Sequence, residues 1–238
     1  MKKLLNYSIK HKLKHIPSAL SQYSYLKYIL PLIHLNNFKI VIGKPFGAQA
    51  YYVIWEELEL IPEDHNLSYG VKHDELEFIE YSEETLGNAL GVAAGISLVN
   101  NQITYCNISD GACQMGATLE AIQYIGAKQL PIFLTVDANN YQLTGSTIDN
   151  MNISSSVLAN MFDNYHWNVI VVPIYIYEMS LGYSEEDAQR LIDDFFEYKK
   201  PTVIIYETLK GQGVREMEDD PVKWHYKELK NIDEITII

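Results

Sequence analysis

The sequence has few cysteines, few basic residues and no long apolar run, and each shortage excludes a class of protein. Only two cysteines, Cys106 and Cys113, occur in 238 residues, too few for a disulfide framework and typical of a reducing compartment. Lys and Arg total 18 against 31 Asp and Glu, and the net charge of −13 argues against nucleic-acid or anionic-membrane partners. No apolar stretch reaches the roughly 20 residues that cross a bilayer, and the first 15 residues do not fit a secretory signal. We therefore expect a cytoplasmic protein.

Short β-rich runs alternate with longer segments of helical period. After a helical stretch in two pieces over residues 1–34, strands are expected at 38–43, 103–108, 132–137, 167–172 and 201–207. Helices are expected at 51–61, 85–99, 115–128, 155–165 and 184–200. The continuous apolar character of the strands predicts an α/β fold, a doubly wound, mainly parallel sheet with helices on both faces. We expect a single domain, 1–238, with 208–238 as a C-terminal extension over the site.

Two of the predicted strands end in residues that suit a metal ion. Asp110 supplies a carboxylate after one strand, and Asn139 supplies an amide oxygen after the next. Ligands collect at the carboxyl ends of such strands, Mg²⁺ prefers oxygen ligands shared with phosphates, and Gly111 would let a diphosphate approach the backbone. The alternative is structural, because Asp-Gly is a common turn and Asn often ends a strand. A nucleotide-binding α/β protein is disfavoured, because the sequence contains neither G-x-x-x-x-G-K-[ST] nor a strand-linked G-x-G-x-x-G.

The run around these residues resembles a known motif. SDGACQMGATLEAIQYIGAKQLPIFLTVDANNYQLTG, at 109–145, resembles the thiamine diphosphate motif of transketolases, which opens with Gly-Asp-Gly and closes with an Asn near a Gly. Further segments resemble that family in the same order: KHIPSALS at 14–21, KIVIGKPFGAQAYY at 39–52, YSEETLGNALGVAAGISL at 81–98 and TLKGQGVREMEDDPVKWH at 208–225. The resemblance therefore covers most of the chain.

The resemblance implies that thiamine diphosphate and Mg²⁺ are cofactors of this protein. By position, Asp110, Asn139 and the main-chain carbonyl of Tyr141 would be the metal ligands. Gly111 would contact the diphosphate through its backbone, and Leu86, in the loop that opens a helix, would lie near the aminopyrimidine ring.

Four further residues match catalytic positions of the family. His15, His73 and His225 match histidines around the thiazolium and the reacting end of the substrate, where imidazoles can move protons, and His225 would also contact the cofactor. Glu120 matches a glutamate at a dimer interface that links protons between two sites. The alternative for Glu120 is a solvated residue on a helix.

Several residues depart from the family pattern. Phe46 replaces a histidine that touches the diphosphate, which would cost about 1 kcal/mol of binding. Glu84 replaces a glycine near the cofactor, so its carboxylate must point away or pair with a base. Met115 replaces an acidic residue of the interface, Ser109 replaces the first glycine of the motif, and PIYIYEMS at 173–180 replaces Asp-Gly-His-Asp. These changes indicate either a divergent substrate or reduced chemistry.

The implied activity is transfer of a two-carbon ketol unit between sugars or sugar phosphates. Transketolases are much longer than this chain, so the resemblance implies a partner, a C-terminal transketolase-like subunit that carries the pyrimidine-binding domain. A heterotetramer with two copies of each chain is the simplest symmetric assembly. Two alternatives stay open: the same chemistry on an unusual acceptor, as in branched-sugar biosynthesis, or a non-catalytic structural or regulatory subunit of a related enzyme.

Overall fold

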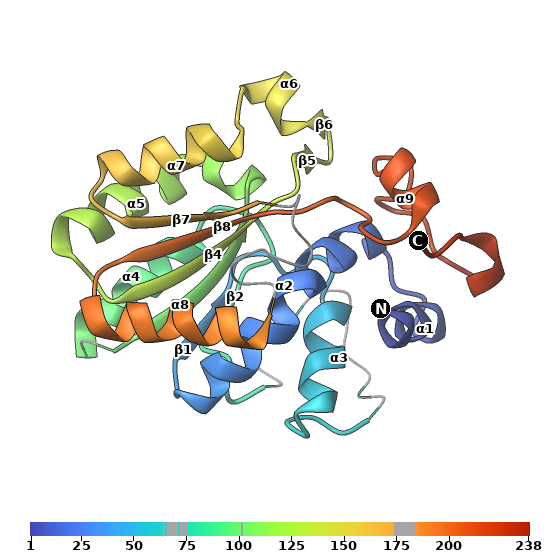
Figure 1. Ribbon diagram of the computed structural model, residues 1–238, viewed down its shortest axis with the longest axis horizontal. Helices are drawn as coiled ribbons and strands as arrows, with labels where there is room; N and C mark the ends of the chain where they lie inside the picture. The colour runs from blue at the N-terminus through green and yellow to red at the C-terminus, as the bar shows by residue number, and fades with distance from the viewer. Residues whose placement is uncertain (64, 66–70, 72–75, 101, 174–183) are drawn as a thin grey trace.

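A parallel sheet forms the centre of the molecule. The computed structural model describes residues 1–63, 65, 71, 76–100, 102–173 and 184–238, and within them a six-stranded sheet has the order β2-β1-β3-β4-β8-β7 (Figure 1). Every neighbouring pair in this sheet runs parallel. The strands are Lys39–Ile42 (β1), Tyr81–Ser82 (β2), Thr104–Ser109 (β3), Ile132–Ala138 (β4), Asn168–Val172 (β7) and Thr202–Glu207 (β8). The predicted parallel α/β fold is confirmed.

Helices cover both faces of the sheet (Figure 1). One hydrophobic core joins the sheet to α1 (Lys2–Lys10), α2 (Ile16–Leu35), α3 (Gln49–Glu57) and α8 (Glu185–Tyr198). A second core on the opposite face joins it to α4 (Ala89–Asn100), α5 (Gly116–Lys128) and α7 (Ser155–Asn164). All seven helices coincide with predicted helical segments, although several begin or end at different residues.

Alternating side chains of the central strands feed the two cores. Phe133 of β4 belongs to the first core and its neighbour Leu134 to the second; Ile204 and Ile205 of β8 divide in the same way. All four are completely buried, and burial of a side chain of this size contributes about 1.5–3 kcal/mol. This two-sided burial explains why the strands read as continuous apolar runs.

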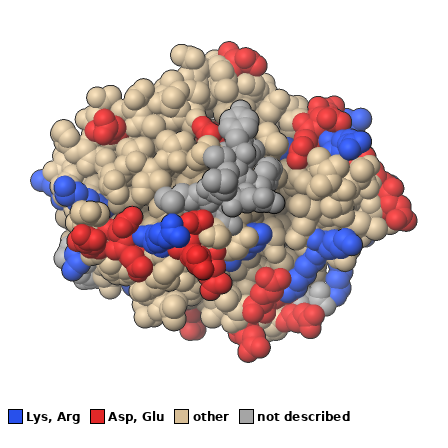
Figure 2. Space-filling view, in the orientation of Figure 1, with Lys and Arg blue, Asp and Glu red and all other residues tan. Residues whose placement is uncertain are grey.

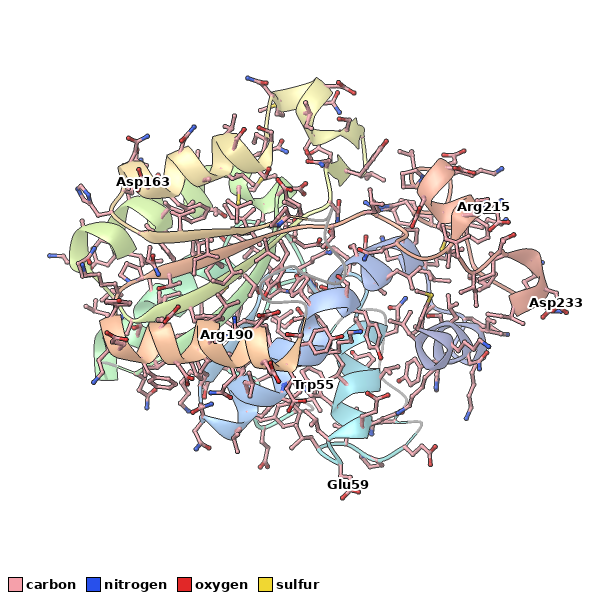
Figure 3. All side chains as sticks on the ribbon, in the orientation of Figure 1. Trp55, Glu59, Asp163, Arg190, Arg215 and Asp233 are labelled. Carbon is pink, nitrogen blue, oxygen red and sulfur yellow. The ribbon has the colours of Figure 1, made fainter. Side chains whose placement is uncertain are left out.

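Trp55, labelled in Figure 3, connects α3 to α2. Its indole Nε1 donates a hydrogen bond to Nε2 of His34 at 2.9 Å, and its ring packs edge-on against Phe78 at a centroid distance of 5.1 Å. Burial lowers the pKa of His34 to about 4. The neutral His34 is therefore a packing residue of this layer.

Shorter elements were not expected from the sequence. A hairpin of Tyr141–Gln142 (β5) and Gly145–Ser146 (β6) leads into α6 (Thr147–Met151), and α9 (Arg215–Asp219) follows the sheet. The expected helix at 85–99 begins later, at Ala89. Its start is set by Glu83, whose carboxylate accepts the N–H groups of Gly87, Asn88 and Ala89 at 3.2, 2.8 and 2.7 Å.

The surface in Figure 2 carries charges of both signs. Basic residues lie among acidic ones along the lower and right edges of this face. Among the helices that the structure describes, none combines the length and apolarity required to cross a membrane.

Candidate functional site

The carboxyl ends of adjacent parallel strands bring polar residues together. Lys44 follows β1, Asp110 follows β3, Asn139 follows β4 and Lys210 follows β8. Lys44, Asn139 and Lys210 line a cleft of about 220 Å³, and Asp110 lies beside it. The residues that line this cleft are Ser18, Lys44, Phe46, Leu86, Ser109, Gly111, Asn139, Tyr141, Gln142, Leu143, Lys210, His225 and Tyr226. The predicted cofactor-binding residues therefore gather at one place, as the sheet topology requires.

Asp110 lies buried beside this cleft, 1% exposed. Its Oδ1 accepts the N–H of Gly111 at 2.7 Å, and its Oδ2 accepts the N–H of Asn140 at 2.8 Å and the hydroxyl of Thr147 at 3.3 Å. Asn140 has a left-handed backbone, with φ of 63°, which Asn tolerates. The turns after β3 and β4 thus hold the carboxylate in place.

Burial and neighbouring groups oppose each other in setting the protonation of Asp110. Burial raises its pKa to about 6, while the two backbone hydrogen bonds and then the charges of Lys44 and Lys210 lower it. The carboxyl is consequently ionised at neutral pH, the state that a metal ligand requires.

Asp137 orients the amide of Asn139. The Asn139 Nδ2 donates to Oδ2 of Asp137 at 3.1 Å and to the hydroxyl of Ser21 at 3.3 Å. The Asn139 Oδ1 accepts the N–H of Tyr141 at 3.1 Å. These hydrogen bonds distinguish the nitrogen of the Asn139 amide from its oxygen, and they place the oxygen on the Tyr141 side.

Two buried lysines complete the site, and we did not predict them. Lys44 and Lys210 are each 5% exposed. Lys44 forms an ion pair with Asp137 and donates to the carbonyl of Ser18 at 3.3 Å. Lys210 donates to the Tyr141 carbonyl at 3.3 Å, and no ion pair of Lys210 occurs among the described residues.

The charge of Lys210 suits an anionic ligand. Burial lowers the pKa of Lys210 to about 8, and Asp110 opposes that shift. A buried ammonium without a carboxylate in contact is costly unless an anion joins it. The signals for both lysines were present in the sequence, as Gly43-Lys44 after one strand and Lys210-Gly211 after another.

The oxygen donors of the cleft fit Mg²⁺. Asp110, Asn139 and the Tyr141 carbonyl offer one carboxylate and two neutral oxygens, which leaves room for the negative charge of a diphosphate on the same ion. Within the described parts of the chain, no group of three His, Cys, Asp or Glu side chains that could hold a metal ion comes together. At Gly111 an added Cβ would lie 3.6 Å from the Ser109 hydroxyl, an ordinary van der Waals distance, so the absence of a side chain there leaves the backbone exposed to the cleft without a packing requirement for glycine.

His15 and His225 pack against each other near the cleft. Their ring centroids are 4.5 Å apart in an edge-on arrangement, and the backbone N–H of His15 donates to the backbone carbonyl of His225 at 3.1 Å. Phe46 and Tyr226 flank His15 at 4.9 and 5.0 Å. Burial lowers the pKa of His15 to about 3 and of His225 to about 4, and the charge of Lys210 adds to both shifts. Both imidazoles are therefore neutral at pH 7.

Not every predicted residue lies at this cleft. Glu120 is exposed on α5 and lines the α4–α5 groove, a shallow hollow of about 790 Å³. Asn88, Gly91, Val92, Ala94, Gly95, Leu98, Ala117, Glu120, Ala121 and Tyr124 line this groove. His73 and residues 174–180 of the PIYIYEMS segment lie outside the described residues.

Glu84 does not line the cleft, so its carboxylate would not face a bound diphosphate. Glu84 is exposed, whereas the adjacent Glu83 is 2% exposed and occupies the N–H groups that begin α4. The carboxylate of Glu83 therefore fills the helix start that would otherwise be open to a phosphate. Leu86 lines the cleft from the loop ahead of this helix.

The match to a protein family decides where the chain belongs. Residues 83–236 match the family described as transketolase, thiamine diphosphate binding domain. The chain belongs to the transketolase family. It is 26% identical over 219 residues to transketolase-like protein 2 of Bos taurus, covering 85% of this chain and 33% of that relative.

Two further proteins are similar to this chain, one in sequence and one in fold. One of the subunits of the apulose-4-phosphate transketolase of Phocaeicola vulgatus is 28% identical over 203 residues, covering 79% of this chain and 68% of that relative. The crystal structure of transketolase from Campylobacter jejuni has the same fold, with a TM-score of 0.63 and 19% identity over 94% of this chain and 40% of that one. The chain thus spans about a third of the length of the longer transketolases that it matches and corresponds to their N-terminal, thiamine diphosphate-binding part.

Proposed function

We propose that this chain is the cofactor-binding subunit of a two-chain transketolase that transfers a two-carbon ketol unit between sugars. One observation carries the proposal: in a chain of this family, Asn139, Tyr141 and the buried Lys44 and Lys210 line one cleft, and the Asp110 carboxylate lies buried beside it. Such a combination suits a divalent ion and a diphosphate held together.

Each residue of the cleft has a role in this proposal. Thiamine diphosphate, when bound, supplies the carbanion stabilisation that ketol transfer needs. Asp110, Asn139 and the Tyr141 carbonyl would hold Mg²⁺, and the Lys210 ammonium would balance the charge of the diphosphate, whereas Lys44 is already paired with Asp137. Gly111 keeps the backbone accessible and Leu86 lies beside the rings.

The histidines handle protons on the substrate side of the cleft. We assign proton transfer at a sugar hydroxyl to His225, which lines the cleft, and to His15, which packs against it; both imidazoles are in the neutral form at pH 7. We assign His73 the same role from its place in the family motif. Glu120 would link protons between two sites across the α4–α5 groove.

A partner chain is part of the proposal. The chain spans about a third of the longer transketolases, and the Phocaeicola vulgatus relative is itself named as one subunit of its transketolase. We infer a C-terminal transketolase-like subunit with the pyrimidine-binding domain, arranged with this chain as a heterotetramer. Sugars or sugar phosphates would bind between the chains.

An unusual sugar acceptor is the second candidate. Phe46 contacts the ring of His15, so the wall of the cleft is apolar where the family has a histidine. The Phocaeicola vulgatus relative is named for apulose 4-phosphate, which supports an acceptor outside the common sugar phosphates. A non-catalytic regulatory subunit would require that the cleft bind no cofactor.

Calorimetric titration with thiamine diphosphate tests the proposal. Wild type with its partner is expected to bind the cofactor in Mg²⁺ and not in EDTA. Asp110→Asn should weaken binding by about 100-fold or more, since a metal ligand contributes at least as much as its supporting residues. Asp163→Asn, an exposed residue on α7, is the matched control and should bind as wild type does. Equal cofactor affinity in Mg²⁺ and in EDTA, or no binding of the cofactor in either, contradicts the proposal.

A further inference from the structure

Lys210 contacts the carbonyl that we assign to the metal. Its Nζ lies 3.3 Å from the Tyr141 oxygen, and its side chain is 5% exposed. The segment that carries it is fixed to α2, because the N–H of Gly211 donates to the Pro17 carbonyl at 3.0 Å. Gly211 has φ of 91°, and a Cβ there would lie 2.6 Å from the Met217 backbone, so this turn requires glycine. The backbone conformation of this turn thus places the Lys210 ammonium at the oxygen that we assign to the metal ion.

We propose that, before the cofactor binds, the Lys210 ammonium occupies the place of the metal ion at the Tyr141 carbonyl. Binding of metal and diphosphate then moves this ammonium from the Tyr141 carbonyl to the diphosphate. The inference rests on the proposed function, in which this carbonyl is a metal ligand. It adds that Lys210 makes the two ligands bind cooperatively.

The charges around the cleft are the physical basis for the proposed cooperativity between metal and diphosphate binding. Lys44 pairs with Asp137, whereas Lys210 and Asp110 influence each other electrostatically without a described ion pair between them. A divalent ion alone would meet the ammonium of Lys210 at the same oxygen, and two cations repel strongly in a buried site. A diphosphate attracts both cations, so each ligand raises the affinity for the other.

Lys44 differs from Lys210 in how firmly it is held. The Lys44 ammonium contacts Asp137, the Ser18 carbonyl and the Ser21 hydroxyl. The described contacts of the Lys210 ammonium are limited to the Tyr141 carbonyl. A single neutral acceptor is weaker than a carboxylate with two further acceptors, so Lys210 is the lysine that can move.

Binding of Mn²⁺ and pyrophosphate to the full chain together with its partner tests the inference. Wild type, Lys210→Met and the control Lys128→Met, at an exposed position on α5, are compared at pH 7. Free Mn²⁺ is measured by electron paramagnetic resonance, and pyrophosphate binding by calorimetry with and without Mn²⁺. Thermal unfolding checks that each variant is folded.

In Lys210→Met, the affinity for Mn²⁺ alone and the affinity for pyrophosphate in the presence of Mn²⁺ should change in opposite directions. Lys210→Met is expected to bind Mn²⁺ alone roughly tenfold more tightly and pyrophosphate with Mn²⁺ roughly tenfold more weakly. Lys128→Met should match wild type. Unchanged Mn²⁺ affinity, or a loss of both affinities, overturns the inference while leaving the proposed function intact. A wild-type chain that, together with its partner, binds Mn²⁺ and pyrophosphate in neither order overturns both.

Discussion

Burial decides the protonation of the individual residues in the cleft. The pKa of Asp110 rises to about 6 and that of His15 falls to about 3, so each group is less readily charged than in water. At pH 7 the carboxyl is nevertheless ionised and the imidazole neutral. These are the states needed for a metal ligand and for a proton acceptor.

The depressed pKa of His15 predicts a loss of stability in acid. Between about pH 6.5 and 3 the unfolded chain binds a proton at His15 that the folded chain excludes, so stability falls as the pH is lowered through this window. From pH 7 to pH 5 His15 should cost about 1–2 kcal/mol of unfolding free energy. His15→Gln should lose that much less than wild type in urea unfolding at the two pH values. The exposed His166→Gln serves as the control, and an equal loss in His15→Gln and wild type would refute the assignment.

At the scale of the elements, the start of α4 depends on one carboxylate. Glu83 accepts three backbone N–H groups that no helical carbonyl can reach. The neighbouring Glu84 is exposed. The two adjacent glutamates therefore contribute very differently to the same helix.

We expect Glu83→Ala to destabilise the chain by about 1–3 kcal/mol, because it leaves buried N–H groups without an acceptor. Glu84→Ala is the matched control and should change the unfolding free energy by less than about 0.5 kcal/mol. Urea unfolding followed by circular dichroism measures both. Equal effects of the two substitutions would show that Glu83 does not hold the helix.

The long elements could be predicted from the sequence, whereas the short ones could not. Continuous apolar runs identified the strands, because both faces of the sheet are covered. The hairpin from Tyr141 to Ser146 consists of two-residue strands, too short to show a period of two. The start of α4 was misplaced because the sequence does not reveal which of two glutamates turns inward.

The site was predictable where the family motif names residues. Gly111, Asn139, Tyr141, Leu86 and His225 all line the cleft. Lys44 and Lys210 were missed because a lysine next to glycine usually lies in a solvated loop, and their burial results from contacts with Asp137 and Tyr141 far along the chain.

At the scale of the whole molecule, the α4–α5 groove is open. Gly91 and Gly95 have no heavy atom within 4 Å of an added Cβ, and Leu98 is 52% exposed beside them. This apolar face and Glu120 lie together on two neighbouring helices. We assign the groove to contact with another chain of the proposed heterotetramer.

Filling the groove should prevent assembly without unfolding the chain. Gly95→Tyr adds a side chain where the isolated chain has space, and loss of glycine favours the helix by several tenths of a kcal/mol. Sedimentation velocity of the chain purified with its partner should show a smaller complex for this variant. Ala127→Tyr, exposed on α5 and outside the groove, should keep the wild-type mass. A full-size complex of Gly95→Tyr would exclude the groove as an interface.

The central claim is that the ends of β3 and β4 hold a divalent ion for a diphosphate, and anomalous diffraction from Mn²⁺ in crystals with thiamine diphosphate tests it most directly. We predict a peak about 2.0–2.3 Å from an Asp110 carboxylate oxygen, the Asn139 Oδ1 and the Tyr141 carbonyl oxygen, with the diphosphate on its open side. A bound cofactor with no Mn²⁺ peak near these three atoms would contradict the account.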